Sequence, residues 1–466
     1  MNTWSIRDLA AACQGRLKLG AMPPVGGELE PVGRIIADLN ALRSGDVYWE
    51  LGGRQRPFAE EAFARGALGI VVSGRHVEPW AGKFAIDVDC TRQALERAAH
   101  AARRDFCGQV IIVSGTPLQS ETAQFLESVC GITPGLSPAA GVSDSQSSAM
   151  LHLLNTDSLD DAVICEFPAS SLAEILQQST LCRPRFAVIN SLAKSETAAE
   201  SDDDDSTRWL ESTLNQLPTN GCLILNGDDH ELRRIANLAS TCSQPGRILT
   251  VGRSPNCDLV ASDVSWRNGQ LSFVVEGEPI RVAVWGRHYL PAAMAAFAIG
   301  RMLGHRPRAI AEALGATVLR QETCSVTHTD GVDVVEDASS DDPNGLQHAW
   351  RLLRDMEVAG RRVLAFGDDG SKDLDFYQRL GISAVTVCSA DVLLATGPRA
   401  HEVVTAARMA GMPATRALEC HSDDELERMA RVVINAGDVI LVQGASRHAV
   451  RHVLQNLRRQ EQSQAD

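Results

Sequence analysis

The chain has 466 residues, of which 44% are hydrophobic and 22% charged, the composition of an ordinary soluble globular protein, and its length suggests three domains of about 150 residues each. A formal net charge of -15 argues against nucleic acid or an anionic membrane surface as the main partner. No apolar run approaches the ~18 residues of a membrane span, no basic and apolar leader opens the chain, and the 12 cysteines are scattered singly, so we expect a cytoplasmic protein with reduced thiols.

Residues 1–105 form the first predicted domain, in which short strands mix with helices. Residues 46–51 and 66–72 have strand patterns, and residues 57–65 between them have a helical one. This mixture predicts a small α/β domain.

Residues 106–317 form the second predicted domain, where strand, glycine or polar turn, and helix follow one another repeatedly. This alternation predicts a parallel sheet flanked by helices. The parallel strands are expected at residues 110–113, 162–166, 186–190, 222–226 and 248–251. An antiparallel pair is expected at residues 269–275 and 280–285, a helix at 291–303, and a solvated loop at 195–207 around the aspartate run 202–205.

Residues 318–466 form the third predicted domain, which repeats the alternation on a smaller scale. Its spacing predicts a Rossmann-like doubly wound sheet, followed by a frayed tail at residues 459–466. The expected strands are residues 332–336, 363–367, 384–387, 392–396 and 439–443. The fold class predicted for the whole chain is therefore α/β with three domains.

The most informative motif opens the second domain, where a β-branched run ends at Gly115. A short turn follows, and Ser120 and Glu121 are placed to cap the next helix. This is the layout of a phosphate-binding loop, whose backbone N–H groups and lysine hold the phosphates of a nucleotide. Leu118 and Gln119 stand where such a loop has its second glycine and its lysine. The architecture of a nucleotide enzyme is predicted with part of its phosphate chemistry missing.

Other short segments of the three domains share their order with one known family. They are Asp38, Ser44-Gly45-Asp46, Gly52-Gly53-Arg54 and Gly66-Ala67 in the first domain; Glu166, Arg183-Pro184, Asn190, Asn226-Gly227-Asp228-Asp229 and Gly286-Arg287-His288 in the second; and Glu336-Asp337, Asp342-Pro343, Gly367-Asp368 and Gly437-Asp438 in the third. Together with the loop at Gly115, these segments resemble the motifs of the Mur ligase family. The resemblance implies a UDP-substrate-type domain, a central ATP-binding domain with a P-loop-type parallel sheet, and a smaller C-terminal domain.

Mur ligases join a carboxylate to an amine after ATP phosphorylates the carboxylate, a step that needs a phosphate cradle, a cation and Mg²⁺. The resemblance places Gly115, Thr116, Gln119, Ser120, Asn226 and Asp337 at the nucleotide, Ser120 and Glu166 at Mg²⁺, and Glu166 and His288 among vestigial catalytic residues. Two alternatives stay open: Glu166 is a polar residue at the sheet edge, and His288 is a local capping or packing residue.

Several positions that the family uses carry different residues in this chain. Gln119 and Gln443 replace lysines, and removing such charges as a unit leaves little catalysis. The asparagines that contact the nucleotide in the family correspond to Ala292, Ser340 and Asp342, its metal-site histidine and carbamylated lysine fall near Ser195 and Trp209, and the Ser-Arg that follows the first-domain aspartate is Leu39-Asn40.

These replacements lead to three hypotheses. The first is a Mur ligase homologue linked to peptidoglycan precursor synthesis whose ATP-dependent activity is reduced or lost, and which binds a UDP-muramoyl peptide or a cell-wall synthesis protein. The second is an active amide ligase that adds D-alanyl-D-alanine to a UDP-muramoyl peptide and uses Lys194 or Arg208 in place of the loop lysine. The third is a protein-binding scaffold without nucleotide.

Overall fold

The computed structural model describes residues 4–51, 58–74, 77–115, 118–132, 145–157, 160–167, 172–191, 203–238, 247–320, 324–329, 331–337, 343–367 and 370–444. The chain divides into two compact units. The first unit comprises Met1–Gly115 and Leu126–Thr250, and the second comprises Thr116–Phe125 and Val251–Asp466. None of the helices in the described ranges is both long and apolar enough to cross a membrane.

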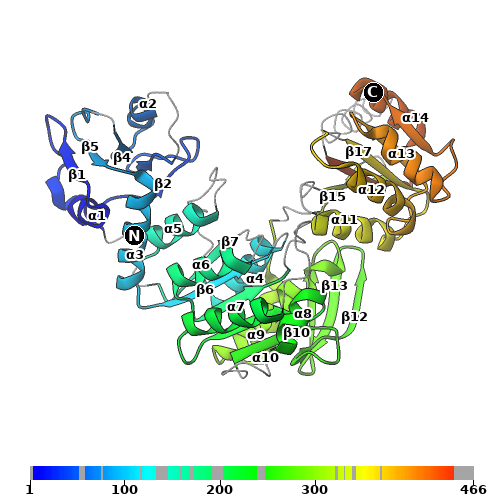
Figure 1. Cartoon of the computed structure of the whole chain (residues 1–466), viewed down its shortest axis with the longest axis horizontal. Coiled ribbons are helices and arrows are strands. Elements are labelled where there is room, and N and C mark those ends of the chain that lie inside the picture. Colours follow the sequence, from blue (N-terminus) through cyan, green and yellow to red (C-terminus); the bar gives the residue numbers. More distant parts are fainter. Residues whose placement is uncertain are drawn as a thin grey trace, which may run out of the picture. The chain divides into compact units, whose positions relative to one another are not determined.

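The N-terminal part of the first unit is a sheet with the strand order β1-β5-β4-β3-β2, parallel except for β1 (Figure 1). Its first helix starts with a capping box, in which Ser5 and Asp8 each accept a hydrogen bond from the other's backbone N–H. The strands are β1 (Arg16–Leu19), β2 (Ile35–Ile36), β3 (Val47–Trp49), β4 (Gly69–Ser73) and β5 (Phe84–Val88), and the helices are α1 (Ile6–Cys13), η1 (Gly27–Leu29), α2 (Phe58–Ala64) and α3 (Thr91–Asp105).

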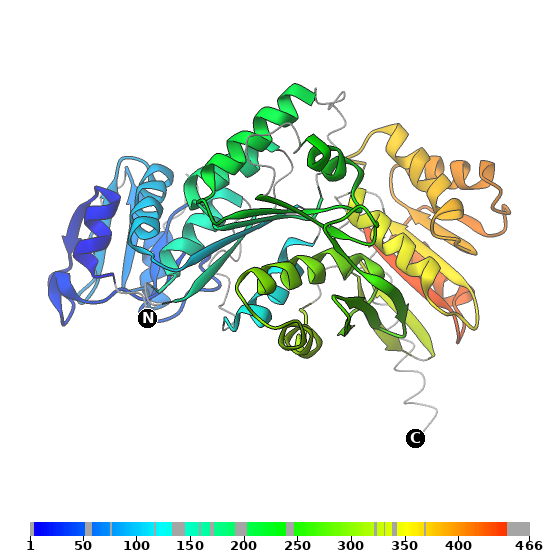
Figure 2. The same cartoon turned by 90° about the horizontal axis from the view of Figure 1, so that it is seen from below.

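The rest of the first unit is built on a sheet with the order β10-β9-β8-β6-β7. Figures 1 and 2 show its strands side by side, with α6 and α7 along one face. Strand β6 pairs in parallel with β7 on one side and β8 on the other, so the strand order reverses there. The strands are β6 (Gln109–Ser114), β7 (Ala162–Phe167), β8 (Phe186–Ile189), β9 (Cys222–Asn226) and β10 (Ile248–Gly252), and the helices are α5 (Ser145–Asn155), α6 (Leu172–Cys182), α7 (Asp203–Gln216) and α8 (His230–Asn237), with α4 (Gln119–Cys130) contributing to both units.

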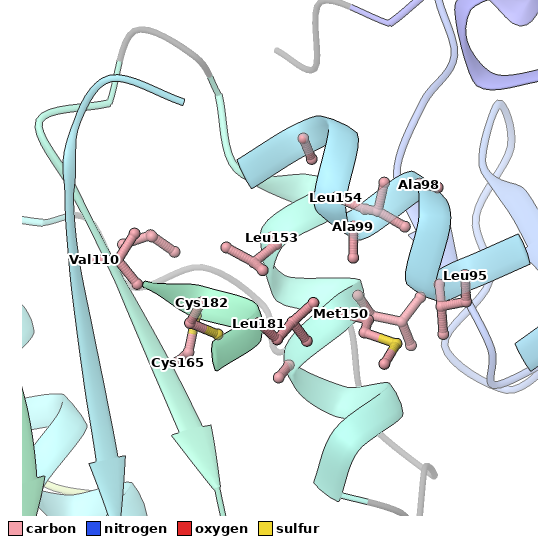
Figure 3. Close-up of a cluster of buried hydrophobic side chains, with 14 of the residues drawn as sticks. Leu95, Ala98, Ala99, Val110, Met150, Leu153, Leu154, Cys165, Leu181 and Cys182 are labelled. Carbon is pink, nitrogen blue, oxygen red and sulfur yellow. The ribbon is translucent and has the colours of Figure 1, made fainter. Parts of the chain in front are cut away.

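One hydrophobic core joins the two sheets of the first unit. Helices α3 and α5 meet face to face in Figure 3, and β6, β7 and α6 close the cluster. The labelled side chains are Leu95, Ala98, Ala99, Val110, Met150, Leu153, Leu154, Cys165, Leu181 and Cys182. A polar link adds to this core, because the amide of Asn155 donates to the carbonyl of Ile35 at 2.9 Å and accepts from its N–H at 2.8 Å.

The longer segment of the second unit begins at the end of β10, which pairs with β11, and continues into the antiparallel sheet β12-β13-β14. A further sheet follows with the order β15-β16-β20-β17-β18-β19, in which only the β15–β16 pair is antiparallel. The strands are β11 (Leu259–Val260), β12 (Ser262–Arg267), β13 (Gln270–Val275), β14 (Glu278–Ala283), β15 (Ser325–Thr329), β16 (Val332–Glu336), β17 (Arg362–Gly367), β18 (Val392–Thr396), β19 (Ala417–Cys420) and β20 (Val439–Gly444). The helices are η4 (Arg287–Tyr289), α9 (Leu290–Met302), α10 (Pro307–Ala316), α11 (Pro343–Asp355), α12 (Leu374–Thr386), α13 (Ala400–Met409) and α14 (Asp423–Val433).

The predicted α/β class, with its parallel central sheet and Rossmann-like C-terminal sheet, is confirmed, while two local predictions are wrong. Residues 384–387 are not a strand: α12 runs through Thr386, because Tyr377, Leu380 and Ala384 bury one face at helical spacing. The aspartate run does not lie in a loop throughout, since α7 starts at Asp203. Strand β12 was not predicted, and the three domain boundaries stay predictions.

Candidate functional site

The glycine turn after β6 is held tightly against the end of β8. Gly115 has φ +97°, and a Cβ there would lie 2.4 Å from the carbonyl oxygen of Ser191 and 2.6 Å from its nitrogen. Next to this contact, the N–H of Asn190 donates to the carbonyl of Ser114 at 3.1 Å. Only glycine suits this position, because it combines a left-handed backbone with a close backbone approach. The turn predicted at Gly115 therefore stands where the strand order reverses, while Thr116 lies outside the described residues.

Glu166 and Asn226 lie at the same edge of this sheet as Gly115. Glu166 pairs in register with Val113, near the carboxyl end of β7, and its side chain is half-buried. Asn226 ends β9; its amide donates to the carbonyl of Asn190 at 3.0 Å and its Oδ1 accepts from the N–H of Asp228 at 3.0 Å. The bond to Asn190 links the end of β9 to the end of β8, so Asn226 has a structural role in addition to any contact with a nucleotide.

The helix after the glycine turn begins with mostly buried side chains. Leu118, where a phosphate loop has glycine, is buried, and its carbonyl accepts from the N–H of Thr122 at 3.0 Å and from its hydroxyl at 2.6 Å. The Oε1 atom of Gln119 is buried and has no hydrogen-bond partner within the described residues. Ser120 is half-buried, and the side chain of Glu121 is 0% exposed. The start of α4 thus carries no basic side chain: Leu118 is apolar, Gln119 and Ser120 are neutral and polar, and Glu121 is acidic.

A nucleotide triphosphate and Mg²⁺ fit this set of residues poorly. Triphosphate binding by such a loop depends on backbone N–H groups freed by glycines and on a lysine. Residues 115–122 contain one glycine, no lysine and no arginine, and they include Glu121. In the described part of the chain, no group of three or more His, Cys, Asp or Glu side chains is arranged to hold a metal ion. The hydroxyl of Ser120 and the carboxylate of Glu166 stay predicted Mg²⁺ ligands.

His288 lies in the second unit, in the short helix η4, and its ring contacts two other rings. It stacks on His348 of α11, with centroids 4.9 Å apart and 14° between planes, and its centroid is 4.2 Å from that of Tyr289. Burial first, and then His348, lower the pKa of His288 well below its usual range. Burial lowers the pKa of His348 to about 4, with Arg351 contributing less. A neutral ring stacked on the chain's own histidine favours the packing alternative for His288 over nucleotide stacking.

Asp337 is fully buried at the end of β16, where it belongs to a chain of hydrogen bonds. The Nε2 group of Gln443, in β20, donates to Oδ2 of Asp337 at 2.8 Å, and Oε1 of Gln443 accepts from the indole N–H of Trp350 at 2.8 Å. The thiol of Cys324 lies near this carboxylate: burial, then Asp337 and then Glu121 raise the pKa of the thiol well above its usual range. Glu121 and Asp337 are therefore two buried acids whose charges both disfavour the thiolate form of Cys324.

Of the other positions at which the chain differs from the residues that the resemblance implies, two are buried and one pair lies in a hydrogen-bonded loop. Trp209 is buried in α7, and its indole N–H donates to the carbonyl of Leu172 at 2.7 Å. Ala292 is fully buried in α9. In the first-domain loop, Arg65 donates to the carbonyl of Leu39 at 2.8 Å and to Oδ1 of Asn40 at 3.2 Å. Ser195, Ser340 and Asp342 lie outside the described residues.

The structure brings the predicted site residues together only in part. Gly115, Glu166 and Asn226 share one sheet edge of the first unit, whereas Gln119, Ser120, His288 and Asp337 belong to the second. Sequence reasoning missed His348. The sequence held no signal for it, because His348 stacks on the ring of His288, which lies 60 positions away in the sequence. It also missed the burial of Glu121, although its place at the start of a helix was predicted.

A sheet whose strand order reverses at a glycine turn, followed along the chain by a Rossmann-like sheet, is the arrangement that the resemblance to the Mur ligases implies, and comparisons with known proteins agree with that resemblance. No family model matches the chain. Among curated proteins, it is similar to the UDP-N-acetylmuramoyl-tripeptide–D-alanyl-D-alanine ligases of Bacillus subtilis (24% identity, 72% of this chain and 73% of that protein) and of Escherichia coli (24% identity, 80% and 83%).

Solved structures show the same fold. The D-alanyl-D-alanyl-adding ligase of Acinetobacter baumannii is 18% identical, covers 98% of both chains and has a TM-score of 0.74. A ligase of the same kind from Thermotoga maritima, solved in complex with ADP, is 18% identical, covers 93% of this chain and 98% of its own, and has a TM-score of 0.67. The predicted Mur ligase fold is thus confirmed over nearly the whole chain.

Proposed function

We propose that this protein is a Mur ligase homologue of peptidoglycan precursor synthesis in which the ATP-dependent step is reduced or lost, and which acts by binding. Its ligand on this view is a UDP-muramoyl peptide or a protein of cell-wall synthesis. The curated relatives are named as ligases of a UDP-muramoyl tripeptide, which supports this substrate class. The activity that we propose to be reduced or lost is phosphoryl transfer from ATP, because the residues at the start of α4 are poorly suited to bind phosphate.

The observation that carries the proposal is the pair of hydrogen bonds that the buried side chain of Gln443 makes within the protein. The family has a lysine at this position, whose charge faces ATP, but here a neutral amide is fully buried and bonded on both sides, to Asp337 and to Trp350. Every hydrogen bond of such a buried bridge serves the fold, because an unpaired buried polar group costs about 1–3 kcal/mol. A side chain in this role is not available to neutralise phosphate.

The replacement of the loop lysine supports the same proposal. Phosphoryl transfer depends on positioning and on charge neutralisation, so a missing cation weakens the transition state directly. Gln119 supplies no charge, and Trp209, near the position of the family's carbamylated lysine, is committed to packing. Gln119, Trp209 and Gln443 are all neutral, where the resemblance implies charged residues.

The alternative of an active ligase requires another cation to replace Gln119. Arg208 is exposed on α7, next to the buried Trp209, and Lys194 lies outside the described residues. Arginine neutralises phosphate, but its planar fork has a different geometry from the lysine ammonium. The alternative therefore has a sharp test, since removal of the cation that replaces the loop lysine, either Arg208 or Lys194, would abolish the activity.

Calorimetry and an activity assay test the proposal together. Purified protein is titrated with ATP and Mg²⁺, and separately with a UDP-muramoyl tripeptide, and phosphate release is followed with D-alanyl-D-alanine present. We expect binding of the UDP-muramoyl peptide and no phosphate release above the enzyme-free rate. Phosphate release that depends on both substrates would overturn the proposal and establish the active-ligase alternative, and its loss in Arg208→Gln or in Lys194→Gln would identify the replacing cation.

A further inference from the structure

Gln124 joins α4 to the backbone that leads into the C-terminal sheet, β15-β16-β20-β17-β18-β19. Its side chain is 7% exposed. Its Oε1 accepts from the N–H of Arg320 at 2.7 Å, and its Nε2 donates to the carbonyl of the same residue at 3.4 Å. The same pair of bonds joins the amide of Asn155 to Ile35 in the first unit. A carboxamide has both an acceptor and donors, so it can hold one residue of the backbone at two points.

Arg320 lies in the connection between α10 and β15, through which the C-terminal sheet is attached to the preceding elements. The described residues on either side of it are packed, since Leu319 is 8% exposed and Cys324 is 0% exposed. Residues 321–323 lie outside the described ranges. Gln124 therefore restrains the backbone at the beginning of this connection.

A second contact ties α11, the first helix of the C-terminal sheet, to η4. The rings of His348 and His288 are stacked, and Nε of Arg287 lies 3.9 Å from Oδ2 of Asp355 at the end of α11. Burial lowers the pKa of both histidines well below its usual value, so both rings are neutral at pH 7 and do not repel each other. The ring of His288 packs closely on its own turn, because a Cβ at Gly286 would lie 2.4 Å from its Nδ1.

The two contacts restrain the C-terminal sheet at different elements. Parts of a chain that are joined by a connecting segment move relative to each other by default, unless the contacts between them prevent it. Here, rotation about the connection would separate the stacked rings, and rotation about the rings would stretch the bonds of Gln124. Both contacts lie within the second unit, which contains the first part of α4, η4 and the C-terminal sheet.

We propose that Gln124 and His348 lock the C-terminal sheet to α4 and η4, so that the second unit stays one rigid body when the protein binds its ligand. The lock goes beyond the proposed function, because it is built from contacts within the protein and does not depend on whether ATP is used.

A distance measurement within the second unit tests the lock. Spin labels on non-natural amino acids replace Arg308 of α10 and Met409 of α13, which are both exposed. Double electron–electron resonance is recorded alone, with a UDP-muramoyl tripeptide, and with ATP and Mg²⁺. We expect one narrow distance distribution whose mean shifts by less than about 2 Å with either ligand. Adding Gln124→Met and His348→Ala together should widen the distribution at least about twofold. The matched control adds Gln177→Met and His348→Phe, which spare the clamp and keep a ring, and should leave it narrow.

Hydrogen exchange resolved to single amides tests the clamp by itself. The N–H of Arg320 donates to Gln124, so its exchange should become at least about tenfold faster in Gln124→Met. The N–H of Ile35, which donates to Asn155 in the first unit, provides the internal control and should keep its rate.

Two results overturn the proposal. One is a broad distribution, or a shift of more than about 2 Å with either ligand, in the labelled protein without further changes, which would show that the sheet is not locked. The other is a narrow distribution that persists in the double variant with its fold intact by circular dichroism, which would show that Gln124 and His348 are not the lock. If the double variant does not fold, Gln124→Glu with His348→Ala replaces it, since glutamate keeps the acceptor for the Arg320 N–H and removes the donor to its carbonyl.

Discussion

The side-chain amide of Gln443 donates a hydrogen bond to the carboxylate of Asp337 at 2.8 Å, and both side chains are 0% exposed. Gln443 lies in β20, and Asp337 directly follows β16, which pairs with β20 in parallel. The amide also accepts from the indole of Trp350, so it ties α11 to the sheet. The position at which the resemblance to the Mur ligases implies a lysine thus belongs to the core of the domain in this chain.

Gln443→Met tests this bridge, because methionine keeps the length of glutamine and removes both polar groups. The change deprives the buried carboxylate of its donor and the indole N–H of its acceptor, and we expect a loss of about 2–4 kcal/mol in the free energy of unfolding. Chemical denaturation measures it. The matched control is Gln177→Met at an exposed position of α6, which should stay within about 0.5 kcal/mol of the unaltered protein.

Strand positions were predictable where a short apolar run meets a clear turn. Residues 222–226 and 332–336 coincide with β9 and β16, since each run is bounded by turn residues. Residues 384–387 were mispredicted because their β-branched side chains outweighed a helical pattern that tertiary packing reinforces: a Cβ at Gly381 would lie 2.2 Å from the carbonyl of Val403, so α12 packs directly on α13.

The position of the candidate site could be predicted from the sequence, but the contacts that its side chains make could not. The run ending at Gly115 marked the turn correctly, because local sequence specifies a strand, a glycine and a helix start. Whether Gln443 faces a ligand or a core depends on Asp337 and Trp350, which lie 106 and 93 residues away. Sequence alone does not identify such distant partners. It therefore showed glutamines at positions 119 and 443, where the resemblance implies lysines, but not the hydrogen bonds that Gln443 makes.

His348→Phe tests the stacked histidine pair through the pH dependence of stability. In the folded protein the pKa of His348 is lowered to about 4, chiefly by burial, whereas the unfolded chain has an ordinary value of about 6.5. The unfolded state therefore binds more protons below pH 6.5, and stability falls as the pH falls toward 4. We expect the unaltered protein to lose about 2 kcal/mol from this histidine between pH 7 and pH 5.

His348→Phe keeps a ring against His288. Between pH 7 and pH 5 the free energy of unfolding of this variant should fall by about 2 kcal/mol less than that of the unaltered protein, as measured by urea denaturation at each pH. The control is His305→Phe, the same substitution at an exposed histidine. Equal slopes in the unaltered protein and in His348→Phe would show that the buried pair is not responsible.

Asn155→Leu tests the link between the two sheets of the first unit. The Asn155 amide bonds both backbone groups of Ile35, whose side chain is fully buried, so the substitution leaves a backbone N–H and C=O without these partners. We expect a loss of about 2–4 kcal/mol in the free energy of unfolding. Asn256→Leu, on an exposed turn, is the matched change, and a similar loss in both variants would argue against the link.

Gly115→Ala tests whether the glycine turn has a tight geometry in a loop that carries Gln119 instead of a lysine. At φ +97° a side chain is strained, and here its Cβ would also stand 2.4 Å from the carbonyl oxygen of Ser191. Gly131 separates these effects: its φ is +69°, and a Cβ there meets nothing within 4 Å. Backbone strain alone costs about 1–3 kcal/mol, so Gly131→Ala should lose an amount in that range and Gly115→Ala distinctly more, by thermal and chemical denaturation. Equal losses would mean that the turn relaxes away from β8, and a loop that relaxes so readily would not hold the backbone arrangement on which phosphate binding depends.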